Sequence, residues 1–202
     1  MILYPLFLKL EGKKVLIVGG GQIAEEKLFG VLRSATDVTV VAPQISEKIR
    51  GWAEQGLLKH VADEYRPGLV REYFLVIAAT DSQTVNQAIY QEAKEAGILC
   101  NAVDDPQYCD FYAPAVVSRG EFQIAISTGG NSPALAQKVR KELEQKYGPE
   151  YESWTGWLGR VRAGLLNVLP RSERRKELLH LLAHAKPASQ PSFLPQINVD
   201  RR

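Results

Sequence analysis

The sequence lacks the features that mark secreted, membrane and nucleic-acid-binding proteins. Its only two cysteines, Cys100 and Cys109, have neither Cys-x-x-Cys spacing nor the density of a disulfide scaffold, so we expect reduced thiols and a cytoplasmic protein. The apolar start, residues 1–10, is too short to cross a bilayer and lacks the basic region and cleavage site of a signal peptide. A formal net charge of only +2 leaves no dense basic face for nucleic acid. We therefore expect neither a membrane nor a nucleic-acid partner.

What remains is an ordinary globular composition, with 45% hydrophobic and 24% charged residues in a chain of 202. That length suits one main domain with a smaller appendage. In the first half, apolar runs typical of doubly buried strands alternate with helical stretches. The predicted strands are 14–18, 38–42, 57–61, 74–79 and 98–103, and the predicted helices are 22–34, 45–55 and 84–96. This alternation predicts an α/β fold, a Rossmann-type doubly wound parallel sheet.

After residue 110 the pattern changes. Residues 115–119 and 122–127 read as two strands around Gly120, and a helix then runs to Tyr147, with Asn131 or Ser132 as its cap. Helices broken near Pro170 are predicted up to residue 185. The predicted organisation is thus a Rossmann domain (1–113), a small β/α module (114–147), a helical C-terminal domain (148–186) and a flexible tail (187–202).

A glycine motif stands directly after the first strand and directly before the first helix. It has the form G-x-G-x-x-A and comprises Gly19, Gly20, Gly21, Gln22, Ile23 and Ala24. In this context the first glycine permits a tight turn, the second lets the backbone approach a pyrophosphate, and the helix N-terminus supplies oriented N–H donors. A plain tight turn is the alternative. We interpret the motif as the seat of a nicotinamide dinucleotide.

The acid expected at the end of the second strand, which would bind the ribose 2′-hydroxyl, is missing. Pro43 and Gln44 follow Ala42 there, so Gln44 or backbone groups would have to hold the ribose. No arginine stands at that strand end to receive a 2′-phosphate, which favours NAD over NADP.

Four further candidate residues stand at the ends of later strands, where ligands of open α/β folds bind. Ala79 and Thr80 leave room for the cofactor at the fourth strand, although Thr80 and Asp81 could instead cap the next helix. Asn101 and Asp104 follow the fifth strand, and a carboxylate beside a nicotinamide could take the proton that accompanies hydride loss. A simple turn at Asp104-Asp-Pro is the alternative.

The C-terminal helices carry no comparable signal. His180 and His184 have metal-compatible spacing without the Glu of a metalloprotease motif, and they read as a solvated helix face. No metal site is predicted. The charged run 171–176 reads likewise as a solvated helix start, although an acidic substrate or partner could meet it.

Taken together, these motifs resemble the precorrin-2 dehydrogenase family of siroheme synthesis, some of whose members are also sirohydrochlorin ferrochelatases. The resemblance covers roughly residues 1–147. Its matching segments are Tyr4-Pro-Leu-Phe7, Val18-Gly-Gly-Gly-Gln-Ile-Ala-Glu-Glu-Lys27, Ala78-Ala-Thr-Asp81 with Val85-Asn86, Cys100-Asn-Ala-Val-Asp-Asp105, and Ser127-Thr-Gly-Gly-Asn-Ser-Pro133.

The resemblance implies NAD-dependent dehydrogenation of precorrin-2 to sirohydrochlorin by a homodimer. Residues 114–147 would be the dimerisation module, the helical end would help close the cleft, and Asp104 would be the catalytic residue. Because precorrin-2 is a polycarboxylate, we expect it to meet a helix-terminal loop and a nearby arginine, namely Arg119, Thr128, Gly129, Gly130, Asn131 and Ser132. Whether the chain also inserts iron or cobalt stays open.

A Rossmann module that senses NAD without turnover is the competing function. Such modules usually keep the acid after the second strand, so its absence here, together with Asp104 and the Thr128 loop, favours the enzyme.

Overall fold

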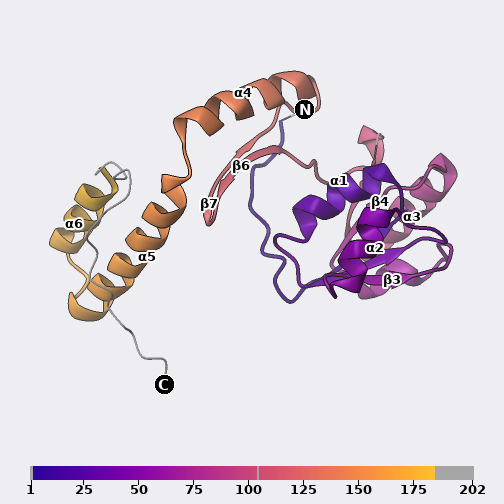
Figure 1. Cartoon of the computed structure of the whole chain (residues 1–202), viewed down its shortest axis with the longest axis horizontal. Helices are drawn as coiled ribbons and strands as arrows, with labels where there is room; N and C mark the ends of the chain where they lie inside the picture. Colours follow the sequence, from indigo (N-terminus) through magenta and orange to yellow (C-terminus); the bar gives the residue numbers. More distant parts are fainter. Residues whose placement is uncertain (1, 104, 185–202) are drawn as a thin grey trace. The chain divides into compact units, whose positions relative to one another are not determined.

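A computed structural model describes residues 2–103 and 105–184 of the chain (Figure 1). The predicted tail at 187–202 and the predicted catalytic residue Asp104 lie outside the described residues. The chain divides into two compact units, residues 1–113 and 114–202.

Unit 1 is built on a parallel sheet in the order β3-β2-β1-β4-β5. Its strands are β1 (Lys14–Val18), β2 (Asp37–Val41), β3 (Lys59–Val61), β4 (Leu75–Ala78) and β5 (Leu99–Ala102). The strand order reverses direction at β1, which places a topological switch point between β1 and β4, where open α/β sheets bind ligands. The predicted Rossmann-type sheet is confirmed.

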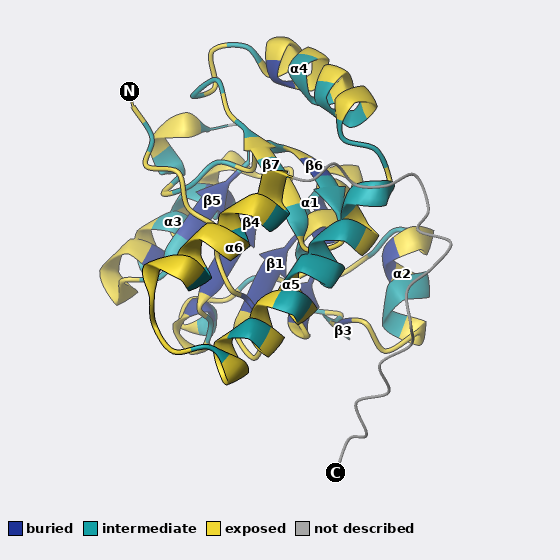
Figure 2. Cartoon of the chain, turned by 90° about the vertical axis from the view of Figure 1, so that its left-hand side faces the viewer, coloured by how far each residue is buried: buried dark blue, intermediate teal, exposed yellow. Residues whose placement is uncertain are grey.

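Helices cover both faces of this sheet because its strands are apolar on both sides, and Figure 2 shows β1, β4 and β5 in the colour of buried residues. The helices are α1 (Gln22–Val31), α2 (Glu47–Glu54) and α3 (Gln83–Ala96). One buried cluster joins Val15 and Ile17 of β1 to Leu28 of α1 and to α2. The other joins Leu16 of β1 to Ile89 of α3. Alternate residues of β1 therefore pack against opposite helical layers, and each face of the sheet has its own buried cluster.

The structure differs from the prediction mainly at element ends. The strand β3 begins at Lys59 because residues before it form a turn, in which Gly56 has φ 72° and the Leu57 N–H donates to the Trp52 carbonyl at 3.0 Å. Two short 3₁₀ helices, η1 (Leu69–Glu72) and η2 (Pro106–Tyr108), carry no periodic apolar pattern and were not predicted.

Unit 2 begins with an antiparallel hairpin of β6 (Ala115–Arg119) and β7 (Phe122–Ile126), followed by α4 (Pro133–Lys146), α5 (Glu150–Val168) and α6 (Glu173–His184). Gly120 closes the hairpin with φ 58°, and the break near Pro170 is confirmed. The hairpin contacts α5 through the aromatic rings of Phe122 and Tyr151, whose centroids lie 5.0 Å apart. No residue of α5 or α6 is buried, so this unit has a thin core of its own.

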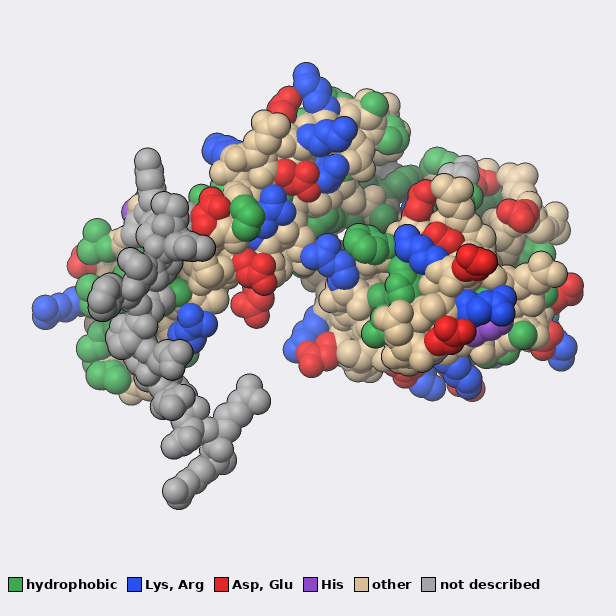
Figure 3. Space-filling model, viewed as in Figure 1, with side chains coloured by type: hydrophobic (Ala, Val, Ile, Leu, Met, Phe, Trp, Pro, Cys, Tyr) green, Lys and Arg blue, Asp and Glu red, His purple; other side chains and the backbone are tan. Residues whose placement is uncertain are grey.

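Acidic and basic side chains are interspersed on the face shown in Figure 3. This distribution agrees with the small net charge and gives that face no continuous basic surface. Within the described residues, no helix combines the length and apolar character needed to span a membrane.

The buried thiol of Cys100 predicts a loss of stability in alkali. Burial, with help from the Asp110 and Cys109 charges, raises the pKa of Cys100 to about 12. In the unfolded chain the thiol has a pKa of about 8.5, so above that pH it ionises in the unfolded chain while it stays neutral in the folded chain. The free energy of unfolding therefore falls as pH rises. Urea unfolding should show a loss of about 1 kcal/mol between pH ~7.5 and ~9.5, with a smaller loss in Cys100→Ala. Equal losses in both proteins would show that other groups cause the effect.

Candidate functional site

The glycine turn after β1 sits where three loops converge. Gly19 has φ 123°, and a Cβ built on it would lie 2.1 Å from the Ala79 carbonyl oxygen. A Cβ on Gly20 would lie 2.0 Å from the carbonyl oxygen of Gln44. No side chain fits at either position. The absence of side chains thus lets the ends of β1, β4 and the loop after β2 pack backbone against backbone.

Gly21 is different, because nothing lies within 4 Å of a Cβ built on it. It is the N-cap of α1 and provides no side-chain cap, so no side chain of its own occupies the positive end of the helix dipole. Gln22 and Ile23 are exposed there, whereas Ala24 is fully buried and holds the helix on the sheet. The result is an open, polar seat for an anion at the switch point.

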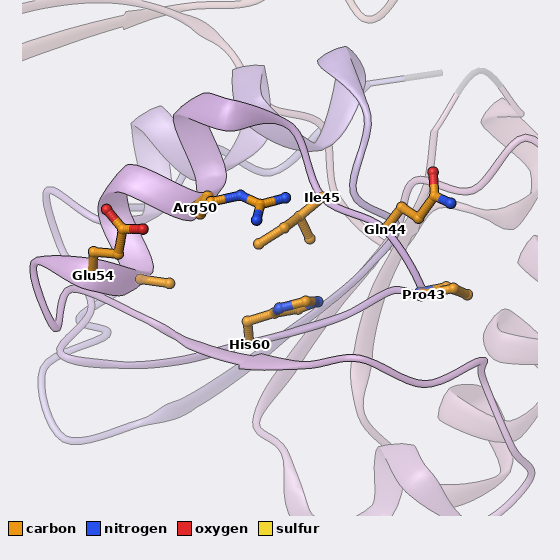
Figure 4. A pocket seen from close by; sticks show the side chains of 7 residues that line it. Pro43, Gln44, Ile45, Arg50, Glu54 and His60 are labelled. Carbon is orange, nitrogen blue, oxygen red and sulfur yellow. The ribbon is translucent and has the colours of Figure 1, made fainter.

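The loop after β2 borders this seat and lines a pocket of about 400 Å³. Pro43 and Gln44 are exposed at its mouth, and the Ser46 N–H donates to the Gly20 carbonyl at 2.9 Å, which ties the loop to the glycine turn. Figure 4 shows Arg50 and His60 among the side chains around the pocket. These two residues were not anticipated, since they lie well beyond the strand end where a ribose contact was sought.

Thr80 at the end of β4 is held by a neighbouring amide. Its hydroxyl lies 2.7 Å from Oδ1 of Asn86, its N–H donates to the same atom at 3.2 Å, and Nδ2 of Asn86 donates to its carbonyl at 3.0 Å. The cap of α3 is Ser82, whose hydroxyl accepts from the Val85 N–H, so the alternative reading of Thr80 and Asp81 as the helix cap is wrong. Thr80 and Ala79 instead form the rim beside Gly19.

Asn101 lies at the end of β5 but is turned towards its own loop. It is buried, and its amide nitrogen donates to the Phe111 carbonyl at 2.7 Å and approaches the Cys109 sulfur at 3.3 Å. The thiol of Cys109 in turn donates to the Ala102 carbonyl at 3.1 Å. These bonds fasten the segment that follows Asp110 to the strand. A contact between Asn101 and a cofactor stays a prediction.

In unit 2, the Thr128 to Ser132 loop forms the entry to α4. Gly129 and Gly130 have φ of 61° and 84°, and the Thr128 hydroxyl accepts from the Ser132 N–H at 3.1 Å. Ser132 caps the helix by accepting from the Leu135 N–H at 3.2 Å. Asn131 is exposed. The loop thus caps α4.

Arg119 is half-buried and binds the end of α4. Its Nε donates to the Tyr147 carbonyl at 3.0 Å and its Nη2 to the Glu144 carbonyl at 3.2 Å, while Nη1 donates to Ser118. The guanidinium therefore satisfies carbonyls at the C-terminus of the helix, a role that the sequence did not suggest.

Arg119→Ala should destabilise unit 2, because it leaves these carbonyls without their charged donor. We expect a loss of about 1–3 kcal/mol in the free energy of unfolding, measured by urea denaturation. Arg119→Lys should recover only part, since one ammonium cannot reach three carbonyls in a fixed fork. A variant as stable as the parent but with weakened substrate binding would favour the ligand role expected from the sequence.

His180 and His184 lie 6.4 Å apart by ring centroids on α6, as expected for a helix face. No group of three or more His, Cys, Asp and Glu side chains within residues 2–103 and 105–184 is arranged to hold a metal ion.

Two family profiles match the chain. One, described as putative NAD(P)-binding, covers residues 6–115, and the other, described as sirohaem biosynthesis protein central, covers residues 119–146. The first contains the glycine turn and the whole sheet. The second contains most of the hairpin and α4.

Whole-chain comparisons agree with these profiles. Siroheme synthase 2 of Yersinia enterocolitica is 37% identical over 199 residues, and siroheme synthase 1 of Aeromonas hydrophila is 36% identical over 186 residues. The alignments cover 98% and 92% of this chain but only 42% and 40% of those relatives. The solved structure of SirC, a precorrin-2 dehydrogenase, is 32% identical with a TM-score of 0.73, over 89% of both chains.

Proposed function

This chain belongs to the family of siroheme synthases and precorrin-2 dehydrogenases, and on that premise we propose that it removes two hydrogens from precorrin-2, with NAD as acceptor, to give sirohydrochlorin. The observation that carries the proposal is the free space at Gly21, at the N-terminus of α1. A glycine turn that excludes side chains at Gly19 and Gly20 yet leaves free space over Gly21 and an uncapped helix N-terminus suits a pyrophosphate.

Each residue of the seat has a stated task in this proposal. The N–H groups of the Gly19 to Ala24 turn bind the pyrophosphate, Pro43 and Gln44 border the ribose, and Ala79 and Thr80 leave room at the rim. When bound, NAD supplies a two-electron acceptor beside the substrate. The hydrogen bonds between Thr80 and Asn86 support a preformed rim for the dinucleotide.

Asp104 is the proposed proton acceptor. With NAD as the hydride acceptor, the carboxylate of Asp104 would take the second hydrogen of the macrocycle as a proton and release it to water. Described residues on either side of Asp104 in the sequence make hydrogen bonds: the Val103 N–H donates to the Ala78 carbonyl at 2.9 Å, and the Asp110 carboxylate accepts from the Cys100 N–H at 2.9 Å.

The polycarboxylate substrate is proposed to meet the loop that caps α4, at Thr128, Gly129, Gly130, Asn131 and Ser132. A helix N-terminus favours negative charge, and the exposed Asn131 adds a donor. Arg119 enters this list only if its bonds to the end of α4 leave donors free for a carboxylate.

A homodimer is part of the proposal, and so is the cytoplasm as its compartment. The second unit buries very little of its own surface: α4 has one buried residue, Ala136, and α5 and α6 have none. Exposed apolar side chains on these helices include Leu135 and Leu166, which a second copy would cover. Both cysteines are free thiols, as a reducing compartment requires.

One assay separates the enzyme from a sensor that binds NAD without turnover. Purified protein is mixed with precorrin-2 and NAD, and NADH formation is followed together with the visible spectrum of the macrocycle. We expect NADH and sirohydrochlorin in equal amounts. Binding of NAD without any change in the macrocycle would favour the sensor and overturn the enzymatic proposal.

A further inference from the structure

Beyond the ribose proposed to lie at Pro43 and Gln44, the pocket after β2 has no assigned occupant. It encloses about 400 Å³ between the loop that follows β2, the helix α2 and the strand β3. Pro43, Gln44 and Ile45 form one wall, and Arg50 and His60 lie around it (Figure 4). The wall is continuous with the dinucleotide seat, because the carbonyl of Gln44 packs against Gly20. A ligand on the glycine turn could therefore extend into this pocket.

Arg50 is the side chain in this pocket that is best suited to bind an anion. Arg50 is exposed, and its guanidinium makes no hydrogen bond or ion pair with the described residues; only its backbone N–H is bonded, to the Ser46 carbonyl at 3.0 Å. A guanidinium is the side chain best suited to a phosphate, since its planar fork can donate two parallel bonds. His60 adds a polar ring: its Nε2 donates at 2.9 Å to the carbonyl of Ala42, the residue that follows β2.

The usual barrier to a phosphate at this place is missing. In dinucleotide folds an acid at the end of the second strand binds the ribose 2′-hydroxyl, and its charge would repel a 2′-phosphate. Here that position holds Ala42, Pro43 and Gln44, none of which is charged. The only acid on the pocket wall is Glu54, one helical turn beyond Arg50 and not paired with it within the described part of the chain.

We propose that this pocket receives the 2′-phosphate of NADP, so that the chain binds NADP as well as NAD, with Arg50 as the residue that determines affinity for the phosphate. The proposal rests on the proposed function in one respect, namely that the glycine turn seats a dinucleotide. Glu54 opposes the phosphate and keeps the preference modest.

The test compares binding of NADH and NADPH to the full chain by calorimetry at low salt. The parent protein should bind NADPH within about tenfold of NADH. Arg50→Ala should weaken NADPH about tenfold or more while changing NADH less than about twofold, as expected for loss of a charge-assisted bond. Glu54→Gln should strengthen NADPH by about threefold, since a like charge is removed.

Lys48→Ala is the matched control. Lys48 is a cation on the same helix, but it lies 3.9 Å from Glu25 and over the ring of Trp52 and does not line the pocket. Equal loss of NADPH affinity in the Lys48 and Arg50 variants would overturn the proposal, because the effect would then be a general one of charge. Binding of NADH without NADPH would also overturn it and would leave the dehydrogenase intact. Binding of neither dinucleotide would overturn both proposals.

Discussion

Replacing Asp104 with Asn should lower kcat by about 10²- to 10⁴-fold, the usual contribution of a general base. Asparagine keeps the size of the side chain but cannot take a proton near neutral pH. The affinity for NAD should stay within about twofold of the parent, because the proposed seat of the dinucleotide lies in the glycine turn. Stopped-flow or steady-state assay of NADH formation, with calorimetric titration of NAD, measures both quantities.

The neighbouring aspartate provides the control for this experiment. Asp105 carries the same charge one residue away, and its carboxylate accepts from Nε2 of Gln83 at 3.3 Å. Asp105→Asn preserves an acceptor for that bond and should keep kcat within about threefold of the parent. Near-normal turnover in Asp104→Asn, or an equal loss in both variants, would remove Asp104 from its role.

The parallel sheet could be predicted because its strands are buried on both faces. An apolar run such as the one in Lys14–Val18 indicates a strand buried on both faces when glycine follows at once and a helical pattern comes next. The glycine seat follows by the same logic, since turn, strand and helix are adjacent in the sequence. Local order along the chain thus carries most of the fold and the centre of the candidate site.

The rest of the site depends on contacts between distant residues. Arg50 comes to the pocket only because α2 folds back over the loop after β2, and His60 comes to it from another strand. From the sequence, Arg119 was expected to meet the carboxylates of the substrate, but the fold brings the carbonyls of Glu144 and Tyr147 to its guanidinium. Such pairs are set by tertiary packing, which no short motif encodes. The short helices η1 and η2 escaped prediction for a related reason, since a single turn has no periodicity.

Alanine substitutions at two glycines of the same turn should have different effects: one on stability, the other on the affinity for NAD. Gly19→Ala should unfold the protein or cost about 2–4 kcal/mol, because φ of 123° strains any side chain and the new Cβ would meet the Ala79 carbonyl at 2.1 Å. That carbonyl is backbone at the end of β4 and cannot move without disturbing the sheet. Urea denaturation and circular dichroism measure the loss.

Gly21→Ala should instead fold normally, since φ of −88° suits alanine and no atom of the chain lies within 4 Å of the new Cβ. The space that the methyl group fills is the space proposed for the pyrophosphate, so affinity for NAD should fall by about 10²-fold or more, as a steric block of backbone N–H donors predicts. A Gly21→Ala protein that binds NAD like the parent would mean that the dinucleotide does not approach α1 at this point. A protein that unfolds would mean that Gly21 serves the chain and not a ligand. Only the combination of retained stability and lost binding assigns the turn to the cofactor.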